Sequence, residues 1–208
     1  MRFRSGRQPC RVDALPVQRP GRGGPAAEDV RQAGFTLVEL MVTLAVAVIL
    51  TVIAVPSFRN ITLSNRLTTT ANALVGAIDT ARMEAVKRNA STQVCSNAAS
   101  RNGSDALGEA CGTNTGAVVA LANGEASSVL AGMAGIHSPI RLNGDVQAIR
   151  FNAQGLGYKP DDPSAAPYTG PVADICTSAL GSANHRVVTM AAGSIVQVDS
   201  SPDTPCND

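Results

Sequence analysis

One long run of apolar residues stands apart from the rest of the chain. From Phe35 to Val55 the sequence reads FTLVELMVTLAVAVILTVIAV, 21 residues whose single charge is Glu39. At about 1.5 Å per residue, a helix of this length crosses the roughly 30 Å hydrocarbon core of a bilayer. Basic residues precede the run, Arg31 nearest to it, and the positive-inside tendency then predicts a cytoplasmic N-terminus and an external body. The sequence therefore predicts a transmembrane helix over residues 35–55.

A second, periodic pattern follows Pro56 and indicates that the helix continues. Apolar residues recur there at steps of three and four, which places them on one face of a helix. This stripe consists of Leu67, Ala71, Leu74, Ile78, Ala81 and Ala85. Polar residues fall between them: Arg66, Asn72, Asp79, Arg82 and Lys87. Because a proline can bend a helix without ending it, we expect one helix over residues 35–90, bent at Pro56 and ending near Asn89.

From Ser91 onward, short runs of β-forming residues alternate with Gly, Asn and Pro, which is typical of a β-rich domain. The expected strands are 92–95, 117–122, 127–130, 140–142, 147–151, 173–177, 186–190 and 194–198. Residues 96–115 are expected to form a polar loop, and residues 159–171, with four prolines, a surface excursion. The predicted fold class is α+β: a long N-terminal transmembrane helix whose C-terminal half packs on a β-sheet domain, residues 91–208.

Composition and charge exclude two classes of binding protein. Only 3 % of the residues are aromatic and Trp is absent, which argues against an aromatic surface for stacking bases or sugars. The formal net charge of +1 hides an asymmetry, because residues 1–34 hold seven of the 17 basic and three of the 16 acidic residues. The head therefore has a net charge of +4 and the remaining body −3. Such a body lacks the positive charge that drives general binding of polyanions.

Cysteines indicate an oxidising compartment for the body. Cys10 lies in the Arg-rich head, and the body holds an even number, which suits two disulfides. Sequence order favours Cys95–Cys111 and Cys176–Cys206, although all three connectivities of four cysteines remain open. There is no CxxC, and His137 and His185 are far along the chain from any cysteine pair. We therefore expect no metal site, and nothing in the sequence calls for a cofactor.

Glu39 separates three interpretations of the apolar run. A carboxylate near the end of an apolar helix costs on the order of 2–3 kcal/mol to insert, so it needs a partner. An ordinary secretory signal has a 7–15-residue apolar region followed by a small-residue cleavage site; this run is longer, and residues 54–57 (AVPS) match that site poorly. A plain membrane anchor leaves Glu39 unexplained. If the chain is cut after Gly34, the new amino group of Phe35 lies one helical turn from Glu39 and can act as its counter-ion.

The segment Gly34-Phe35-Thr36-Leu37-Val38-Glu39 resembles the class III signal of type IV pilins and type II secretion pseudopilins. The resemblance implies that prepilin peptidase cuts between Gly34 and Phe35 and that Phe35 is then N-methylated. It also implies that Glu39 aids assembly by engaging the N-terminus of a neighbouring subunit, and Pro56 matches the helix-kinking proline of these proteins. Residues 1–34 form a longer leader than is usual, either a real extension or the result of a misassigned upstream start codon, and Cys10 leaves with it.

Three short motifs in the body are similar to the H-type pseudopilins and FimT-like minor pilins. They are Val86-Lys87-Arg88-Asn89, Phe151-Asn152-Ala153-Gln154-Gly155, and His185-Arg186-Val187-Val188-Thr189 with Gly193. The resemblance implies a structural subunit of a type II secretion pseudopilus or of a type IV pilus tip. It implies an inner-membrane protein with a periplasmic body. Its expected partners are other pilins or pseudopilins, prepilin peptidase, the inner-membrane assembly platform and inner-membrane lipid.

No motif supports catalysis. Asp161 and Asp162 fit a solvated turn better than a catalytic pair, and His185 fits a surface or packing role better than a ligand site. The segment Gly155-Leu156-Gly157 is too short for a phosphate loop, and no serine lies in a GxSxG elbow. We therefore expect no enzyme.

The alternative function is DNA uptake in natural transformation. FimT-like pilins that bind DNA carry Gly-Arg-x-Arg near the C-terminus, where two arginines can grip phosphates. The aligned residues here are Gly193-Ser194-Ile195-Val196, without either arginine. Nucleic acid is therefore an unlikely partner, and the choice between a secretion pseudopilus and a motility pilus stays open.

Overall fold

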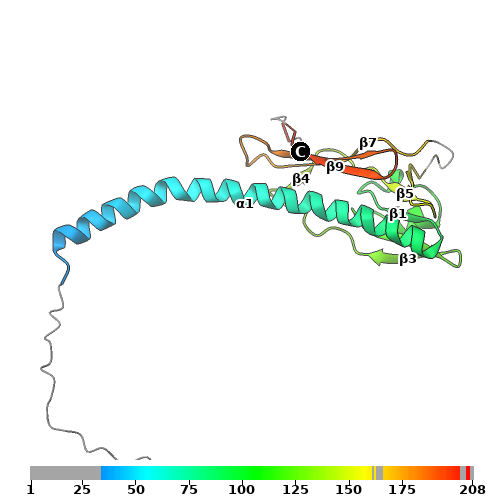
Figure 1. Ribbon diagram of the computed structural model, residues 1–208, viewed down its shortest axis with the longest axis horizontal. Helices are drawn as coiled ribbons and strands as arrows, with labels where there is room; N and C mark the ends of the chain where they lie inside the picture. Colours follow the sequence, from blue (N-terminus) through cyan, green and yellow to red (C-terminus); the bar gives the residue numbers. More distant parts are fainter. Residues whose placement is uncertain (1–33, 161, 163–165, 202–204, 207–208) are drawn as a thin grey trace, which may run out of the picture. The chain divides into compact units, whose positions relative to one another are not determined.

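The structure is a computed structural model that describes residues 34–160, 162, 166–201 and 205–206 (Figure 1). Most of the expected leader, with Cys10, lies outside the described residues, as does Asp161. The chain divides into two compact units, Met1–Ala45 and Val46–Asp208.

Helix α1 spans Leu37–Arg88, 52 residues, and continues through Pro56. Its apolar stripe is buried at every predicted position, from Leu67 to Ala85. The polar residues predicted to fall between those positions are all exposed. Asn89 has a left-handed backbone conformation (φ 49°), which is a common way for a helix to end. The helix therefore stops after Arg88, close to the predicted position.

All strands pair antiparallel in two sheets. The first has the order β3-β2-β1-β5-β6 and the second β4-β7-β8-β9. The first sheet consists of β1 (Thr92–Val94), β2 (Val118–Ala122), β3 (Glu125–Leu130), β5 (Ile149–Phe151) and β6 (Gly157–Tyr158). The second consists of β4 (Arg141–Leu142), β7 (Gly170–Cys176), β8 (His185–Ala191) and β9 (Ile195–Asp199). Each predicted strand overlaps one of these, so the α+β prediction is confirmed.

One hairpin shows how the sequence sets the local turn. Between β2 and β3 lie only Asn123 and Gly124, both with positive φ (55° and 86°). A two-residue loop of this kind matches the right-handed twist of the flanking strands, and Asn-Gly is its preferred sequence.

The prediction of a plain polar loop over residues 96–115 is wrong. This stretch contains a 3-10 turn, Ala99–Arg101, and the helix α2, Ala106–Cys111. Asp105 caps α2 by accepting a hydrogen bond from the Gly108 backbone N–H at 3.1 Å. Leu107 and Cys111, four residues apart, are buried on the same side. Because the stretch is mostly polar, its sequence suggested a loop. The helix depends only on the Asp105 cap and the two buried side chains of Leu107 and Cys111.

The main core lies between the second half of α1 and the two sheets, along which that part of the helix runs (Figure 1). The helix supplies the buried stripe, and the sheets supply Val94, Ile149, Phe151, Ile175 and Val188 among others. A smaller cluster of Cys95, Leu107, Cys111, Ala117 and Val119 holds α2 against the first sheet.

Both disulfides favoured by sequence order are present. Cys95 bonds to Cys111, across a sequence separation of 16, and Cys176 bonds to Cys206, across a separation of 30. The first ties β1 to α2, and the second ties the end of β7 to the C-terminal segment.

Candidate processing and assembly site

The start of α1 is set by Thr36. Its Oγ1 accepts a hydrogen bond from the Glu39 backbone N–H at 3.2 Å, and its carbonyl oxygen accepts one from the Leu40 N–H at 3.1 Å. Thr36 is thus the N-cap, and Thr36-Leu37-Val38-Glu39 has the Thr-x-x-Glu spacing of a capping box. Gly34 and Phe35 lie outside the helix as a consequence. This capping signal is readable in the sequence itself, as Thr36 followed three residues later by Glu39.

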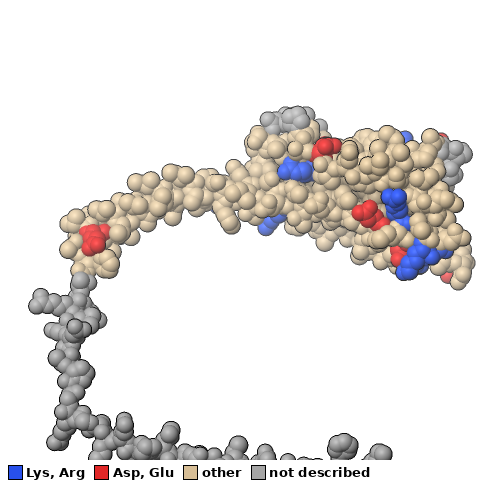
Figure 2. Space-filling model, in the orientation of Figure 1, with Lys and Arg blue, Asp and Glu red and all other residues tan. Residues whose placement is uncertain are grey.

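Glu39 occupies the first turn of α1, where a negative charge is favoured by the unpaired backbone N–H groups of the helix N-terminus. It is the only acid between Gly34 and Ile78, and the nearest cation in the described part of that stretch is Arg59. Arg59 is twenty residues, more than five helical turns, further along α1. In Figure 2 the acidic group stands on an otherwise uncharged stretch of helix. Within one subunit, Arg59 is therefore too far along the helix to pair with Glu39.

The apolar run of α1 is fully uncovered. Every residue from Gly34 to Ile61 is exposed, and Phe35 is 80 % exposed. Within the described residues this is the one helix long and apolar enough to cross a membrane. A continuous apolar surface of this size needs lipid or other protein around it.

Comparison with known proteins finds one match around the apolar run and a second one over most of the β-rich domain. Residues 30–55 match the prokaryotic N-terminal methylation motif. Residues 70–194, more than half of the chain, match the family described as type II transport protein GspH. The chain belongs to the GspH family. No curated protein and no solved structure gives a match.

The GspH family is a family of structural pseudopilins and not of enzymes. With its methylation motif, this GspH-family chain is a minor pseudopilin of the class that prepilin peptidase processes. Its fibre partners are other pilins or pseudopilins, and its apolar helix fits a protein anchored in the inner membrane.

His185 has a packing role. Its side chain is fully buried, and its Nδ1 lies 2.9 Å from both carboxylate oxygens of Asp174. Asn143 donates to Asp174 Oδ2 at 2.8 Å. Because His185 is on β8, Asp174 on β7 and Asn143 just after β4, the three residues fasten the neighbouring strands of the second sheet.

Arg186 is committed to the chain itself. Its guanidinium donates to the carbonyl oxygens of Ala183 and His185, both at 2.8 Å. It also donates to Ser64 Oγ at 3.1 Å and Thr68 Oγ1 at 3.3 Å on α1. These contacts anchor β8 to the helix. The family comparison does not support the DNA-uptake alternative.

The other candidate residues have ordinary structural surroundings. In the segment around Gly155, Asn152 Oδ1 accepts from the backbone N–H groups of Gln154 and Leu156, which forms the turn into β6. Asp162 is exposed. No group of three or more His, Cys, Asp or Glu residues that could hold a metal occurs in the described part of the chain.

The structure adds a polar network that no sequence pattern indicated. Arg150 on β5 donates to Gln93 Oε1 at 2.6 and 3.0 Å and to Asp105 Oδ1 at 2.7 Å. Partial burial opposes ionisation of Asp105, but the bonds from Arg150 and the Gly108 N–H outweigh it and hold the pKa of Asp105 below its usual value. The network joins β1, β5 and the N-terminus of α2.

Proposed function

We propose that this chain is a minor pseudopilin that joins the initiating or tip complex of a type II secretion pseudopilus. Residues 1–34 are the leader, residues 35–90 the assembly helix with its transmembrane part at 35–55, and residues 91–208 the periplasmic domain. The N-terminus faces the cytoplasm, and prepilin peptidase and the inner-membrane assembly platform act on the chain there.

The observation that carries the proposal is the continuous exposure of the helix from Gly34 to Ile61, with Glu39 as its only acid, in a chain whose body matches GspH. Lipid solvates this surface before assembly, and the helices of neighbouring subunits replace the lipid in the fibre. The amino group of Phe35, on the same or a neighbouring subunit, neutralises Glu39 once the leader is removed.

The test of assembly is Glu39→Ala. We expect normal removal of the leader and a strong loss of incorporation into sheared fibres, measured by immunoblotting of the fibre and membrane fractions. Glu84→Ala is the matched control, because Glu84 is an acid on the same helix that is already paired with Lys87 and Arg88 at 3.2 and 2.6 Å. Normal incorporation of Glu39→Ala would remove the proposed role of this residue.

The test of processing is Gly34→Leu. A Cβ at Gly34 meets no atom within 4 Å among the described residues, so no steric conflict with them stands in the way of using the substitution to report on the peptidase. We expect only the full-length band in cells that contain prepilin peptidase. A shorter mature band of unchanged intensity would refute the assigned cleavage site.

A further inference from the structure

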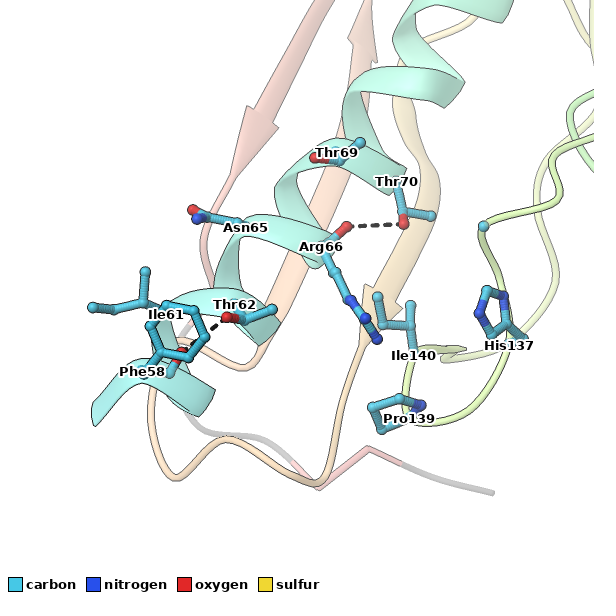
Figure 3. Close-up of a pocket in the computed structure, with 11 residues that line it drawn as sticks. Phe58, Ile61, Thr62, Asn65, Arg66, Thr69, Thr70, His137, Pro139 and Ile140 are labelled. Atoms are coloured by element: carbon cyan, nitrogen blue, oxygen red, sulfur yellow. Dashed lines mark hydrogen bonds between the residues drawn. The ribbon is translucent and has the colours of Figure 1, made fainter. Parts of the chain in front are cut away.

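A groove lies along α1 just beyond the apolar run. It has a volume of about 620 Å³ and is formed by one face of α1 and the segment that precedes β4. Its lining includes Phe58, Ile61, Arg66, His137, Pro139 and Ile140. Figure 3 shows the Arg66 side chain directed from the helix toward Pro139 and Ile140, with His137 on the far wall. We call this feature the juxtamembrane groove.

The position of the groove relative to the bilayer follows from helix geometry. Phe58 is three residues after Val55, about 5 Å along the axis, and Arg66 is about 16 Å along it. The headgroup layer on each side of a bilayer is about 5–8 Å thick. Side chains on a helix lean toward its N-terminus, and a long Arg side chain can extend its charge further in that direction. The apolar end of the groove is therefore at headgroup depth, and Arg66 reaches back toward it.

The charge of this segment has one sign. Between Glu39 and Asp79 the only charged residues are Arg59 and Arg66, and no residue lining the groove is acidic. Within the described part of the chain, no hydrogen bond or ion pair engages either guanidinium. The groove thus combines an apolar floor, exposed Phe58 and Ile61, with an available cation.

We propose that the juxtamembrane groove holds one anionic phospholipid while the chain resides in the bilayer. The phosphate pairs with Arg66, and the glycerol backbone of the lipid, with its ester-linked carbons, lies against Phe58 and Ile61. The inference rests on the proposed placement of residues 35–55 in the membrane. A second copy fits less well, because the same segment of α1 in that copy would bring two more cations toward Arg66 and no acid.

The test uses the full chain in a non-ionic detergent, with dioleoyl phosphatidylglycerol and dioleoyl phosphatidylcholine added at equal concentration. Native mass spectrometry counts the lipids retained per chain. We expect one retained phosphatidylglycerol and a preference for it of about fivefold, the contribution typical of one Arg near an anionic lipid surface. Arg66→Gln should abolish the preference and Arg66→Lys should keep part of it. Arg82→Gln, on the same helix but outside the groove, should leave it unchanged.

A second variant separates the groove from general surface charge. Thr69 lines the groove and is exposed, so Thr69→Phe fills the space without altering charge. We expect it to lose the retained lipid while circular dichroism stays that of the wild type. Equal retention of both lipids by the wild type would overturn the proposal, as would an equal loss in Arg82→Gln. An Arg66-dependent dimer without lipid would overturn it in favour of a second copy.

Flotation with vesicles of the same two lipids distinguishes a failure of the groove proposal from a failure of residues 35–55 to anchor the chain in the membrane. If every variant floats but no lipid preference is found, the groove proposal fails alone. If the wild type does not float, the placement of residues 35–55 fails, and the groove proposal fails with it.

Discussion

The two halves of α1 are both rich in apolar residues, yet their surroundings are opposite. Leu44 in the first half is 58 % exposed, whereas Leu74 in the second half is 1 % exposed. In the first half apolar residues follow one another without a break, and in the second they form a stripe with polar residues between them. A continuous run suits an apolar solvent on all sides, and a stripe suits a core on one side. Burial in this molecule follows the pattern of apolar residues and not their number.

The largest difference between the two halves should appear when one leucine in each half is replaced by alanine. Leu74→Ala removes a fully buried side chain from the main core and should lower the free energy of unfolding by about 2–5 kcal/mol. Leu44→Ala, the same change on an exposed site, should leave it within about 0.5 kcal/mol. Denaturant unfolding of the full chain in detergent, followed by a spectroscopic signal of the β-sheet domain, measures both changes in free energy. Equal losses would show that the first half also belongs to the cooperative unit.

The Cys95–Cys111 disulfide should come next in size. Replacing both cysteines by alanine frees a loop with a sequence separation of 16, which corresponds to about 3 kcal/mol of unfolded-state entropy. The same unfolding measurement should show this loss, with helicity of the first half unchanged in detergent. If the helicity of the first half also fell, the two halves would be energetically coupled, which would contradict the comparison.

Thr36→Ala should act only on the first half. It removes the oxygen that accepts from the Glu39 N–H, and loss of an N-cap costs about 1 kcal/mol of local helix stability. Hydrogen exchange of the Glu39 amide in micelles should become about fivefold faster, and Thr36→Ser should restore it. Amides near Leu74 serve as the internal control. A change in their exchange would contradict the independence of the two halves.

The smallest effect should come from Asp105→Asn, which keeps a good helix cap and removes the charge paired with Arg150. At pH 7 we expect a loss below about 1 kcal/mol, because the pair is partly exposed. The folded pKa of Asp105 lies below its unfolded value. Its charge therefore adds stability above the unfolded pKa, near 4, and this contribution disappears as pH falls through the folded pKa. The difference from the wild type should shrink as the pH falls below about 4, and a difference that stays constant would refute the assignment.

The parts of the fold that follow local patterns were predictable. The stripe of α1 and the alternating β runs depend on neighbours a few positions apart, so their positions could be read directly. Strand β6 is only two residues long and exists because Arg150 and Phe151 of β5 pair with it. Helix α2 has six residues, too few for a clear period, and its signal lay in Asp105 as the cap.

Site residues were likewise predictable only where their signal lies in consecutive residues. The capping sequence around Thr36 and the isolation of Glu39 were visible in consecutive residues. The partner of His185 was not, because Asp174 comes close only through the pairing of β7 with β8, in which Cys176 lies opposite His185. The groove beside Arg66 needed residues 58–70 and 135–140 together, and no sequence pattern relates these distant segments.

The arrangement of the disulfides has a consequence for how the chain matures. The two bonds join consecutive cysteines of the body, Cys95 with Cys111 and Cys176 with Cys206, so their loops neither cross nor enclose one another. If the part of the chain that follows the transmembrane segment crosses the membrane in sequence order, these cysteines emerge in native pairs, one pair at a time. A thiol oxidase that joins each cysteine to the next to emerge therefore produces the native bonds. We therefore expect this domain to form its native bonds by oxidation alone, without an isomerase to rearrange wrong pairs.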